Sequence, residues 1–169
     1  DTGALSPEEY AKWVLTTCGM ACTSMTLQHF KSRKEGIVTL AKDALKHDVY
    51  REGASEISGM KYKEFTDWIE QYGLRAQIYT RANVRGLQKL LSDGKLVIVS
   101  VNPNIRGYET ASLTQKGGHL VLVTGYDKMA NTITLHNPSG FVSYDTQEDH
   151  TMPVHEFLKY YANRGVSVV

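Results

Sequence analysis

Two cysteines, Cys18 and Cys22, are the only thiols in this 169-residue chain, and they lie in the stretch TTCGMACTSM. A thiolate can attack a carbonyl carbon, ligate a metal or exchange with a disulfide. The CxxxC spacing differs from the CxxC of redox pairs, and successive helical turns suit disulfide geometry poorly. Together with His119 the two thiols would supply only three zinc ligands. The stretch therefore favours nucleophilic chemistry at Cys18, with Cys22 as a core residue one turn further on.

Cys18 is expected in the first turn of a helix, because Thr16 or Thr17 can cap its beginning. The unpaired backbone N–H groups and the positive end of the helix dipole there favour a thiolate over a thiol. The same N–H groups can hold a developing oxyanion, and Gly19 leaves room for a substrate carbonyl. This is the setting of a nucleophile, which still needs a base to take its proton.

The second half of the chain offers a base and a residue to orient it. His119 opens the strand-like segment HLVLVTGY after two glycines, and Asn137 closes the segment TITLHN. The residues between them predict an antiparallel hairpin that folds near Met129. With the fold centred there, His119 and Asn137 are diagonal neighbours on one apolar face, which we expect to meet the cysteine helix. The asparagine oxygen can then accept from one ring nitrogen and fix the tautomer of the imidazole.

These segments carry a family resemblance. CGMACTSM, GGHLVLVTGYD and LHNPSG, in this order, resemble the bacteriocin-leader-type (double-glycine) cysteine peptidases of the papain-like superfamily. The resemblance implies a bacterial thiol protease that cleaves a peptide or amide bond through a thioester acyl-enzyme, with a small-residue subsite. It implies Cys18 as the nucleophile, His119 as the general base and acid, and Asn137 as the orienting residue. No metal or organic cofactor is implied.

One position departs from the pattern of that superfamily, which places an oxyanion-donating glutamine six residues before the nucleophile. Lys12 stands there in this chain. Its ammonium can donate a hydrogen bond, Thr17 can do so instead, and Gly19 and Gly118 are further candidates for oxyanion or substrate contacts. Loss of one oxyanion donor typically costs about 10²–10³ in turnover. Two alternatives to hydrolysis therefore stay open: a transglutaminase-like acyl transfer on the same triad, and a non-catalytic peptide-binding module with a degraded oxyanion hole.

The elements around these residues indicate an α+β fold. Ser6, Pro7 and Glu9 form a capping box that predicts a first helix. Further helical patterns occupy residues 18–30, 38–48, 61–73, 83–94 and 154–165, and strand patterns occupy residues 74–80, 96–102, 119–127, 132–137 and 165–169. We predict one papain-like cysteine peptidase domain over residues 1–169, with the nucleophile helix packed on a mostly antiparallel sheet. The loop of residues 103–116 is expected to border the cleft.

Composition and charge exclude several function classes. A hydrophobic content of 41% and a charged content of 22% are ordinary for a soluble globular protein. The net charge of +1 provides no basic surface for nucleic acid, and the longest apolar runs are too short to span a membrane. The expected partner is a peptide or protein substrate, and the expected state is a monomer. The chain begins with aspartate and shows no transporter segment, so we expect a processed, secreted or cell-surface hydrolase.

Overall fold

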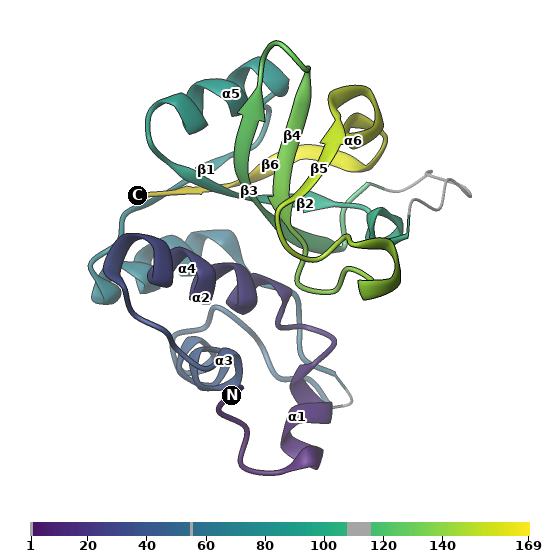
Figure 1. Cartoon of the computed structure of the whole chain (residues 1–169). Helices are drawn as coiled ribbons and strands as arrows, with labels where there is room; N and C mark the ends of the chain where they lie inside the picture. Colours follow the sequence, from purple (N-terminus) through teal and green to yellow (C-terminus); the bar gives the residue numbers. More distant parts are fainter. Residues whose placement is uncertain (1, 55, 108–115) are drawn as a thin grey trace. The chain divides into compact units, whose positions relative to one another are not determined.

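The computed structural model describes residues 2–54, 56–107 and 116–169. Their contacts divide the chain into two compact units. The first unit runs to Ile78 and includes Val169, and the second runs from Tyr79 to Val168. Figure 1 shows that the first unit is built of helices and the second of strands with flanking helices. This is the mixed helix and antiparallel sheet class that the sequence predicts, whereas one domain over residues 1–169 stays a prediction.

The first unit contains the helices that the capping and periodicity patterns predict. They are α1 (Pro7–Trp13), α2 (Cys18–Lys31), α3 (Ile37–Lys46), α4 (Tyr62–Trp68) and the short 3₁₀ helix η1 (Ile69–Tyr72). At the start of α1, Ser6 Oγ accepts from the Glu9 backbone N–H at 3.2 Å. At the end of η1, Gly73 has φ +75°, a left-handed conformation that favours glycine and stops a helix. Local signals of a few residues thus suffice to set these helix ends.

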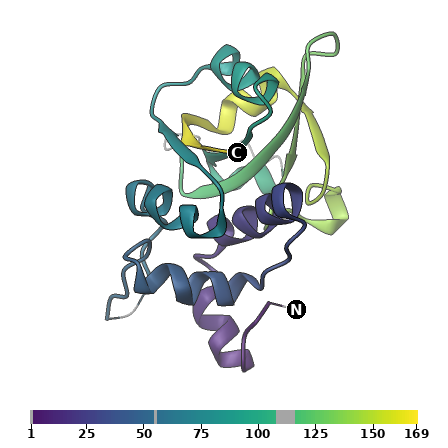
Figure 2. The ribbon, with the colours of Figure 1, turned by 90° about the vertical axis from the view of Figure 1, so that its left-hand side faces the viewer.

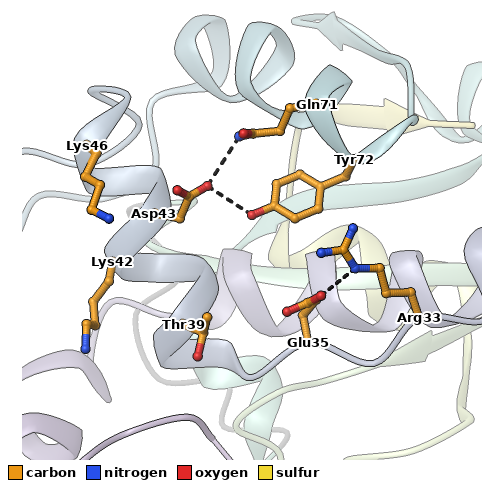
Figure 3. Close-up of a pocket in the computed structure, with 8 residues that line it drawn as sticks. All are labelled: Arg33, Glu35, Thr39, Lys42, Asp43, Lys46, Gln71 and Tyr72. Carbon is orange, nitrogen blue, oxygen red and sulfur yellow. Dashed lines mark hydrogen bonds and ion pairs between the residues drawn. The ribbon is translucent and has the colours of Figure 1, made fainter.

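An open polar cavity of about 450 Å³ lies against α3 in the first unit (Figure 3). It is lined by Arg33, Glu35, Thr39, Lys42, Asp43, Lys46, Gln71 and Tyr72. Asp43 Oδ2 accepts from Trp68 Nε1 at 2.9 Å, from Tyr72 Oη at 3.0 Å and from Gln71 Nε2 at 3.3 Å. Burial raises the pKa of Asp43, but the hydrogen bonds from Trp68 and Tyr72 and the charges of His47 and Lys46 outweigh it and hold the pKa below its ordinary value. One carboxylate thereby joins α3 to the α4–η1 segment.

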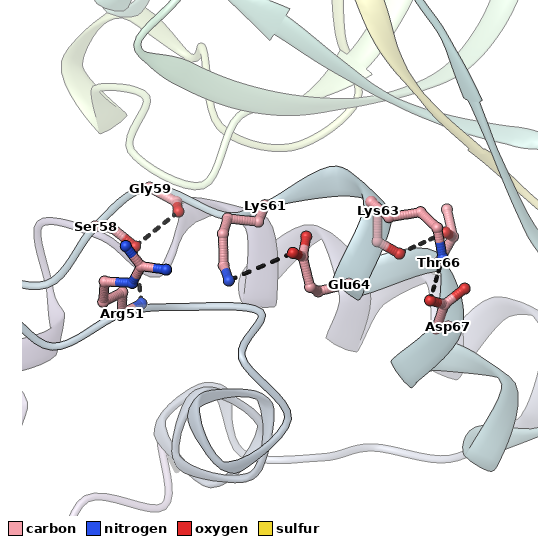
Figure 4. A network of polar contacts seen from close by, with 8 residues as sticks. All are labelled: Arg51, Ser58, Gly59, Lys61, Lys63, Glu64, Thr66 and Asp67. Carbon is pink, nitrogen blue, oxygen red and sulfur yellow. Dashed lines mark hydrogen bonds and ion pairs between the residues drawn. The ribbon is translucent and has the colours of Figure 1, made fainter.

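The segment between α3 and α4 is held by polar contacts on its own backbone (Figure 4). The Arg51 N–H donates to Ser58 Oγ at 2.8 Å, and the Lys61 N–H donates to the carbonyl of Val49 at 2.9 Å. Lys61 Nζ also lies 3.5 Å from Glu64 Oε1. Surface ion pairs of this kind contribute about 0–1 kcal/mol. The backbone hydrogen bonds therefore do most to fix this segment before α4.

The second unit is built on an antiparallel sheet with the strand order β6-β2-β3-β4-β5. These strands are β2 (Leu96–Val101), β3 (His119–Asp127), β4 (Thr132–His136), β5 (His150–Pro153) and β6 (Tyr161–Val168). The remaining elements are β1 (Ala76–Tyr79), which contains the boundary between the units, α5 (Val84–Ser92), α6 (Val154–Tyr160), η2 (Pro103–Arg106) and η3 (Val142–Tyr144). The order places β3, which begins with His119, in the middle of the sheet.

The β3–β4 hairpin has the predicted register near its base. Leu122 pairs with His136, as a fold centred on Met129 requires. A bulge further along β3 then shifts the register by one residue, so that Gly125 pairs with Thr134. The tip of the hairpin projects away from the rest of the second unit, and Met129 there is 95% exposed (Figure 2). The register is thus as predicted at the end that carries the site residues and differs at the tip.

One apolar face of the sheet packs with α5 and α6. Val121 of β3 and Ile133 of β4 share a fully buried cluster with Leu87 of α5 and Phe157 of α6. Within the second unit the cover of this face is α5 and α6, and the meeting of the cysteine helix with this face stays a prediction. Each helix is joined to its neighbouring strands by short connections, so it must pack against the sheet. The apolar side of each helix therefore faces the sheet.

Two strands differ from the sequence prediction, because β6 begins earlier than expected and β5 lies where no strand is expected. The helix expected over residues 154–165 ends at Tyr160, and β6 begins at Tyr161. Tyr161 pairs with Val101 of β2 and is fully buried. The hydrogen bonds and burial gained in the sheet therefore outweigh the helical preference of this segment. Strand β5 lies in a segment that reads as a polar loop, and it pairs with β4 through contacts such as Ile133 to Met152. In both cases the partner strand is far away in sequence.

Candidate active site

Cys18 is the first residue of α2, where the sequence analysis expects a nucleophile. It is half-buried, whereas Cys22 is fully buried. Thr17 occupies the N-cap position, but its side chain forms no capping hydrogen bond. Thr16 Oγ1 instead donates to the carbonyl of Trp13 at 3.2 Å. The expected threonine side-chain cap is therefore wrong, and no N-cap side chain competes for the N–H groups of the first turn.

Cys22 is a core residue, as the sequence predicts. It belongs to the buried face of α2 together with Met20 and Leu27. Burial raises the pKa of the Cys22 thiol well above its ordinary value, and the neighbouring charge of Cys18 adds to this. A protonated, inaccessible thiol is a poor nucleophile. The two cysteines thus have unlike environments although they lie one helical turn apart.

Tyr50 is a buried neighbour of the cysteine pair that the sequence analysis does not single out. Its side chain is 1% exposed, and its ring packs edge-on against Trp13 with 6.1 Å between ring centroids. Burial raises the pKa of the Tyr50 hydroxyl, and the charges of Cys18 and Cys22 raise it further. No hydrogen-bond partner reaches this hydroxyl from the described residues. At neutral pH it is protonated beside the thiols.

The lysine in place of the expected glutamine is held by an ion pair. Lys12 Nζ donates to Glu52 Oε1 at 2.6 Å, and the two side chains are 49% and 50% exposed. An exposed, solvated ammonium is a weak oxyanion donor, because water screens its charge. Of the other oxyanion candidates, Gly19 is buried within the first turn of α2.

We expect replacement of Lys12 by alanine to lower the kcat for a peptide substrate by less than about tenfold. The reason is that Lys12 is occupied by Glu52 at the surface. Steady-state kinetics of Lys12→Ala, with Lys63→Ala as a matched exposed-lysine control, measures this. A loss of about 10²–10³ restricted to Lys12→Ala would instead make its ammonium an oxyanion donor.

The two glycines before β3 bring the chain into the strand with an unusual backbone. Gly117 has φ +108° and Gly118 has φ +98°, both in the region that side chains rarely adopt. A Cβ at Gly117 would also lie 2.5 Å from Arg164 Nη2. Gly118 is exposed, so its backbone is accessible to a ligand.

The expectation that residues 103–116 border a cleft falls largely on residues 108–115, which lie outside the described residues.

His119 and Asn137 are joined by a buried hydrogen bond, as the hairpin register predicts. His119 Nε2 lies 2.8 Å from Asn137 Oδ1, and each side chain is 2% exposed. The backbone N–H of Ser139 donates to the same Oδ1 at 3.2 Å. Because that N–H can only donate, the amide atom facing it is the oxygen, and Nε2 must carry the imidazole hydrogen. Nδ1 therefore holds the lone pair that can accept a proton.

Ser139 and Arg106 complete this network, and neither is among the site residues predicted from sequence. Ser139 Oγ lies 3.2 Å from His119 Nε2, and Arg106 Nε donates to Ser139 Oγ at 2.7 Å. The residues NPSG form a β-turn in which the Gly140 N–H donates to the Asn137 carbonyl at 3.1 Å. An Asx-turn in this motif was a usable signal for Ser139. Arg106 comes from η2, and no local pattern points to it.

Burial lowers the pKa of His119 to about 4. The hydrogen bond to Asn137 opposes this shift, and the positive charge of Arg106 adds to it. The imidazole is therefore neutral at pH 7, in the form that acts as a base. Among the described residues, no group of three or more potential metal ligands is present, and none of the helices has the length and apolar content to cross a membrane.

The lowered pKa of His119 predicts a pH-dependent stability. Between about pH 4 and pH 6.5 the unfolded imidazole binds a proton that the folded one excludes, so folding is favoured increasingly as pH rises through this window. The contribution is on the order of 3 kcal/mol, present above pH 6.5 and lost toward pH 4. Urea unfolding of the wild type and of His119→Phe at both ends of the window measures it. An equally steep pH dependence in the variant would contradict the assignment.

The structure thus holds His119 and Asn137 together in the second unit, and Cys18 at a helix start in the first. The sequence matches the Peptidase_C39 like family over residues 6–168, nearly the whole chain. The chain belongs to this C39-like peptidase family. The catalytic roles of the three residues remain predictions for this C39-like protein, since family membership does not assign them.

Solved structures of peptidase domains share the fold of this C39-like protein. A C39-like peptidase from Bacillus anthracis has a TM-score of 0.62 at 15% identity, over 90% of this chain and 88% of the other. The peptidase domain of Streptococcus ComA, a bifunctional ABC transporter of a quorum-sensing pathway, has a TM-score of 0.56 at 13% identity, over 90% and 89%. A double glycine motif protease from an AMS/PCAT transporter, solved with its leader peptide, has a TM-score of 0.53 at 17% identity, over 92% and 83%. No curated protein matches the chain in sequence.

Proposed function

We propose that this C39-like protein is a cysteine peptidase with Cys18, His119 and Asn137 as its triad. The observation that carries the proposal is the buried hydrogen bond of 2.8 Å between His119 Nε2 and Asn137 Oδ1. It leaves a neutral imidazole with its lone pair on Nδ1, which is the state that a general base requires. Family membership and the placement of Cys18 at the start of α2 support the proposal that Cys18 is the nucleophile.

The mechanism is acyl transfer to water. His119 Nδ1 takes the proton of the Cys18 thiol, and the thiolate attacks the carbonyl carbon of the substrate. The oxyanion is held by backbone N–H groups at the start of α2, where no N-cap side chain competes for them. The imidazolium gives its proton to the leaving amine, and the thioester forms. Water then loses a proton to His119 and attacks the thioester, which releases the acid and restores the thiol.

The lowered pKa of His119 acts in opposite directions on the two proton transfers. A weakly basic imidazole is unprotonated over the physiological range, so its lone pair is available to the thiol, but its low basicity makes this transfer thermodynamically unfavourable. Once protonated it is a strong acid, which favours protonation of the leaving amine. Asn137 keeps the ring oriented through both steps, because its oxygen accepts from Nε2–H whether the imidazole is neutral or charged.

A peptide with small residues at the cleavage position is the substrate class that we propose. The support is the likeness to a double glycine motif protease that was solved with a leader peptide. We further propose that the protein acts outside the cytoplasm, as a secreted or cell-surface enzyme. A substrate-profiling screen with peptide libraries tests the first part, and enrichment of glycine or alanine before the cleaved bond is the expected result.

Selective alkylation tests the proposed function directly. Iodoacetamide should modify Cys18 at least ~10²-fold faster than Cys22, because a thiolate at a helix start is reactive and a buried thiol is not. Mass spectrometry of tryptic peptides, with the unfolded protein as a reference for equal accessibility, measures the two rates. Equal and slow modification of both thiols would favour the non-catalytic binding module. Amine adducts of the substrate in place of hydrolysis products would indicate the acyltransferase.

A further inference from the structure

We propose that Arg106 and Ser139 are positioning residues that hold the proton of His119 on Nε2 and keep Nδ1 as its base. The inference rests on the proposed function, and it names two residues that neither the family resemblance nor the comparisons assign. It starts from a chain of three hydrogen bonds that links η2, the turn after β4 and the first residue of β3.

The Nε2–H group has two acceptors. Asn137 Oδ1 lies 2.8 Å from Nε2, and Ser139 Oγ lies 3.2 Å from it. Since the Ser139 backbone N–H identifies Oδ1 as the oxygen, the hydrogen between these atoms belongs to the imidazole. Both oxygens then share one hydrogen, and each favours the tautomer that carries it on Nε2.

Arg106 holds the Ser139 hydroxyl oxygen in place beside the imidazole. A serine hydroxyl can either donate or accept, and donation to Nε2 would favour the opposite tautomer. Arg106 Nε can only donate, and it lies 2.7 Å from Ser139 Oγ. Because Nε2–H is the second donor, the hydroxyl oxygen accepts from both sides, and its own hydrogen is directed away from His119. The guanidinium thus acts on the imidazole through Ser139 without touching it.

The position of Arg106 is itself fixed by its backbone. Its carbonyl accepts from Thr146 Oγ1 at 2.8 Å, and Thr146 is fully buried. Thr146 Oγ1 accepts in turn from the Phe141 N–H at 2.8 Å, just after the turn that contains Ser139. A Cβ at Gly140 would lie 2.3 Å from the Thr146 carbonyl oxygen, so only glycine permits this close approach. Both ends of the Arg106–Ser139 hydrogen bond are therefore anchored to one buried threonine.

Arg106 also supplies a charge. Among the described residues, it is the charged group that acts on His119, and it acts from η2, while Asn137 acts from the turn after β4. A fixed positive charge disfavours a second one on the imidazole. Loss of the guanidinium should therefore raise the pKa of His119, and loss of the Ser139 hydroxyl should weaken the tautomer preference.

Nuclear magnetic resonance of ¹⁵N-labelled imidazole tests the inference without any need for activity. We expect Arg106→Gln to raise the pKa of His119 by about 1–2, because a charge a few ångströms away is lost at an effective dielectric constant of about 20–40. Arg106→Lys should restore much of the lower pKa. Ser139→Ala should increase the Nδ1–H tautomer, and Ser139→Thr should reverse this. Arg85→Gln, which removes an exposed arginine of the same unit, is the matched control and should leave both signals unchanged.

The pH profile of kcat/KM provides the second readout. Its acid limb should move upward in Arg106→Gln by the same amount as the pKa of His119, whereas Arg85→Gln should not move it. An unchanged pKa in Arg106→Gln together with an unchanged tautomer in Ser139→Ala would overturn the inference. A wild-type protein that cleaves no peptide would overturn the proposed function instead, and the resonance comparison would still decide whether these two residues position His119.

Discussion

Replacement of Cys18 by alanine is expected to reduce peptide cleavage by at least ~10⁴-fold, because removal of a covalent nucleophile leaves only binding and oxyanion contacts to act on the substrate. The change removes one sulfur from a half-buried position at the start of α2, so the fold should be retained. The kcat for a peptide found by library screening, together with circular dichroism of the variant, measures both effects. Trapped acyl-enzyme, seen as a mass increase on the wild type, should also disappear.

Cys22→Ala is the matched control for that experiment. It removes the same atom one helical turn away, from a fully buried side chain whose raised pKa keeps it protonated. Truncation at this site leaves a small cavity, so stability is expected to fall by about 1–2 kcal/mol while kcat stays within a few-fold. Comparable activity in Cys18→Ala and the wild type would rule out Cys18 as the nucleophile. Comparable losses in both variants would point to a shared structural defect.

Replacement of His119 by alanine should lower kcat by about 10²–10⁴, the usual contribution of a general acid–base group. The thiol of Cys18 then loses the base that takes its proton, and the leaving amine loses its acid. Alkylation of Cys18 at neutral pH should slow in parallel. Because His119 is 2% exposed, its removal also opens space beside Asn137, and added imidazole should recover part of the activity.

His155→Ala is the control for the loss of an imidazole. The His155 side chain is 72% exposed and lies near Glu156 on α6, within the same unit as His119. Its removal should leave kcat, the alkylation rate and the melting temperature unchanged. Loss of activity in His119→Ala that imidazole restores identifies proton transfer as the missing function. Loss with an altered circular dichroism spectrum and no rescue would mean that His119 is structural.

Helix ends and local pairing were predictable from sequence because their signals lie within a few residues. The box of Ser6, Pro7 and Glu9 marks the start of α1, and Gly73 marks the end of η1. The hairpin register near its base, and with it the His119–Asn137 contact, follows from side-chain alternation about a turn near Met129. The bulge that shifts the register toward the tip lies next to Gly125, and an isolated glycine in a strand pattern was a usable signal for it.

Contacts between distant segments were not predictable, because their energy appears only once the chain has brought the partners together. Residues after Tyr160 form strand β6 instead of the predicted helix because they pair with β2. A polar segment forms strand β5 because it pairs with β4. The cover of the sheet by α5 and α6 depends likewise on how the strands are ordered.

The residues of the candidate site also fall into those that local sequence signals predict and those that only distant contacts bring together. The sequence by itself singled out Cys18, His119 and Asn137, since a helix start, a strand start and a turn are each encoded locally. Only the tertiary structure placed Arg106 of η2 on Ser139, and Ser139 on the imidazole. It also showed that Lys12 is bound by Glu52 at the surface. The arginine and lysine side chains are long, polar and compatible with many partners. Which partner each one binds is therefore decided by where the backbone places it.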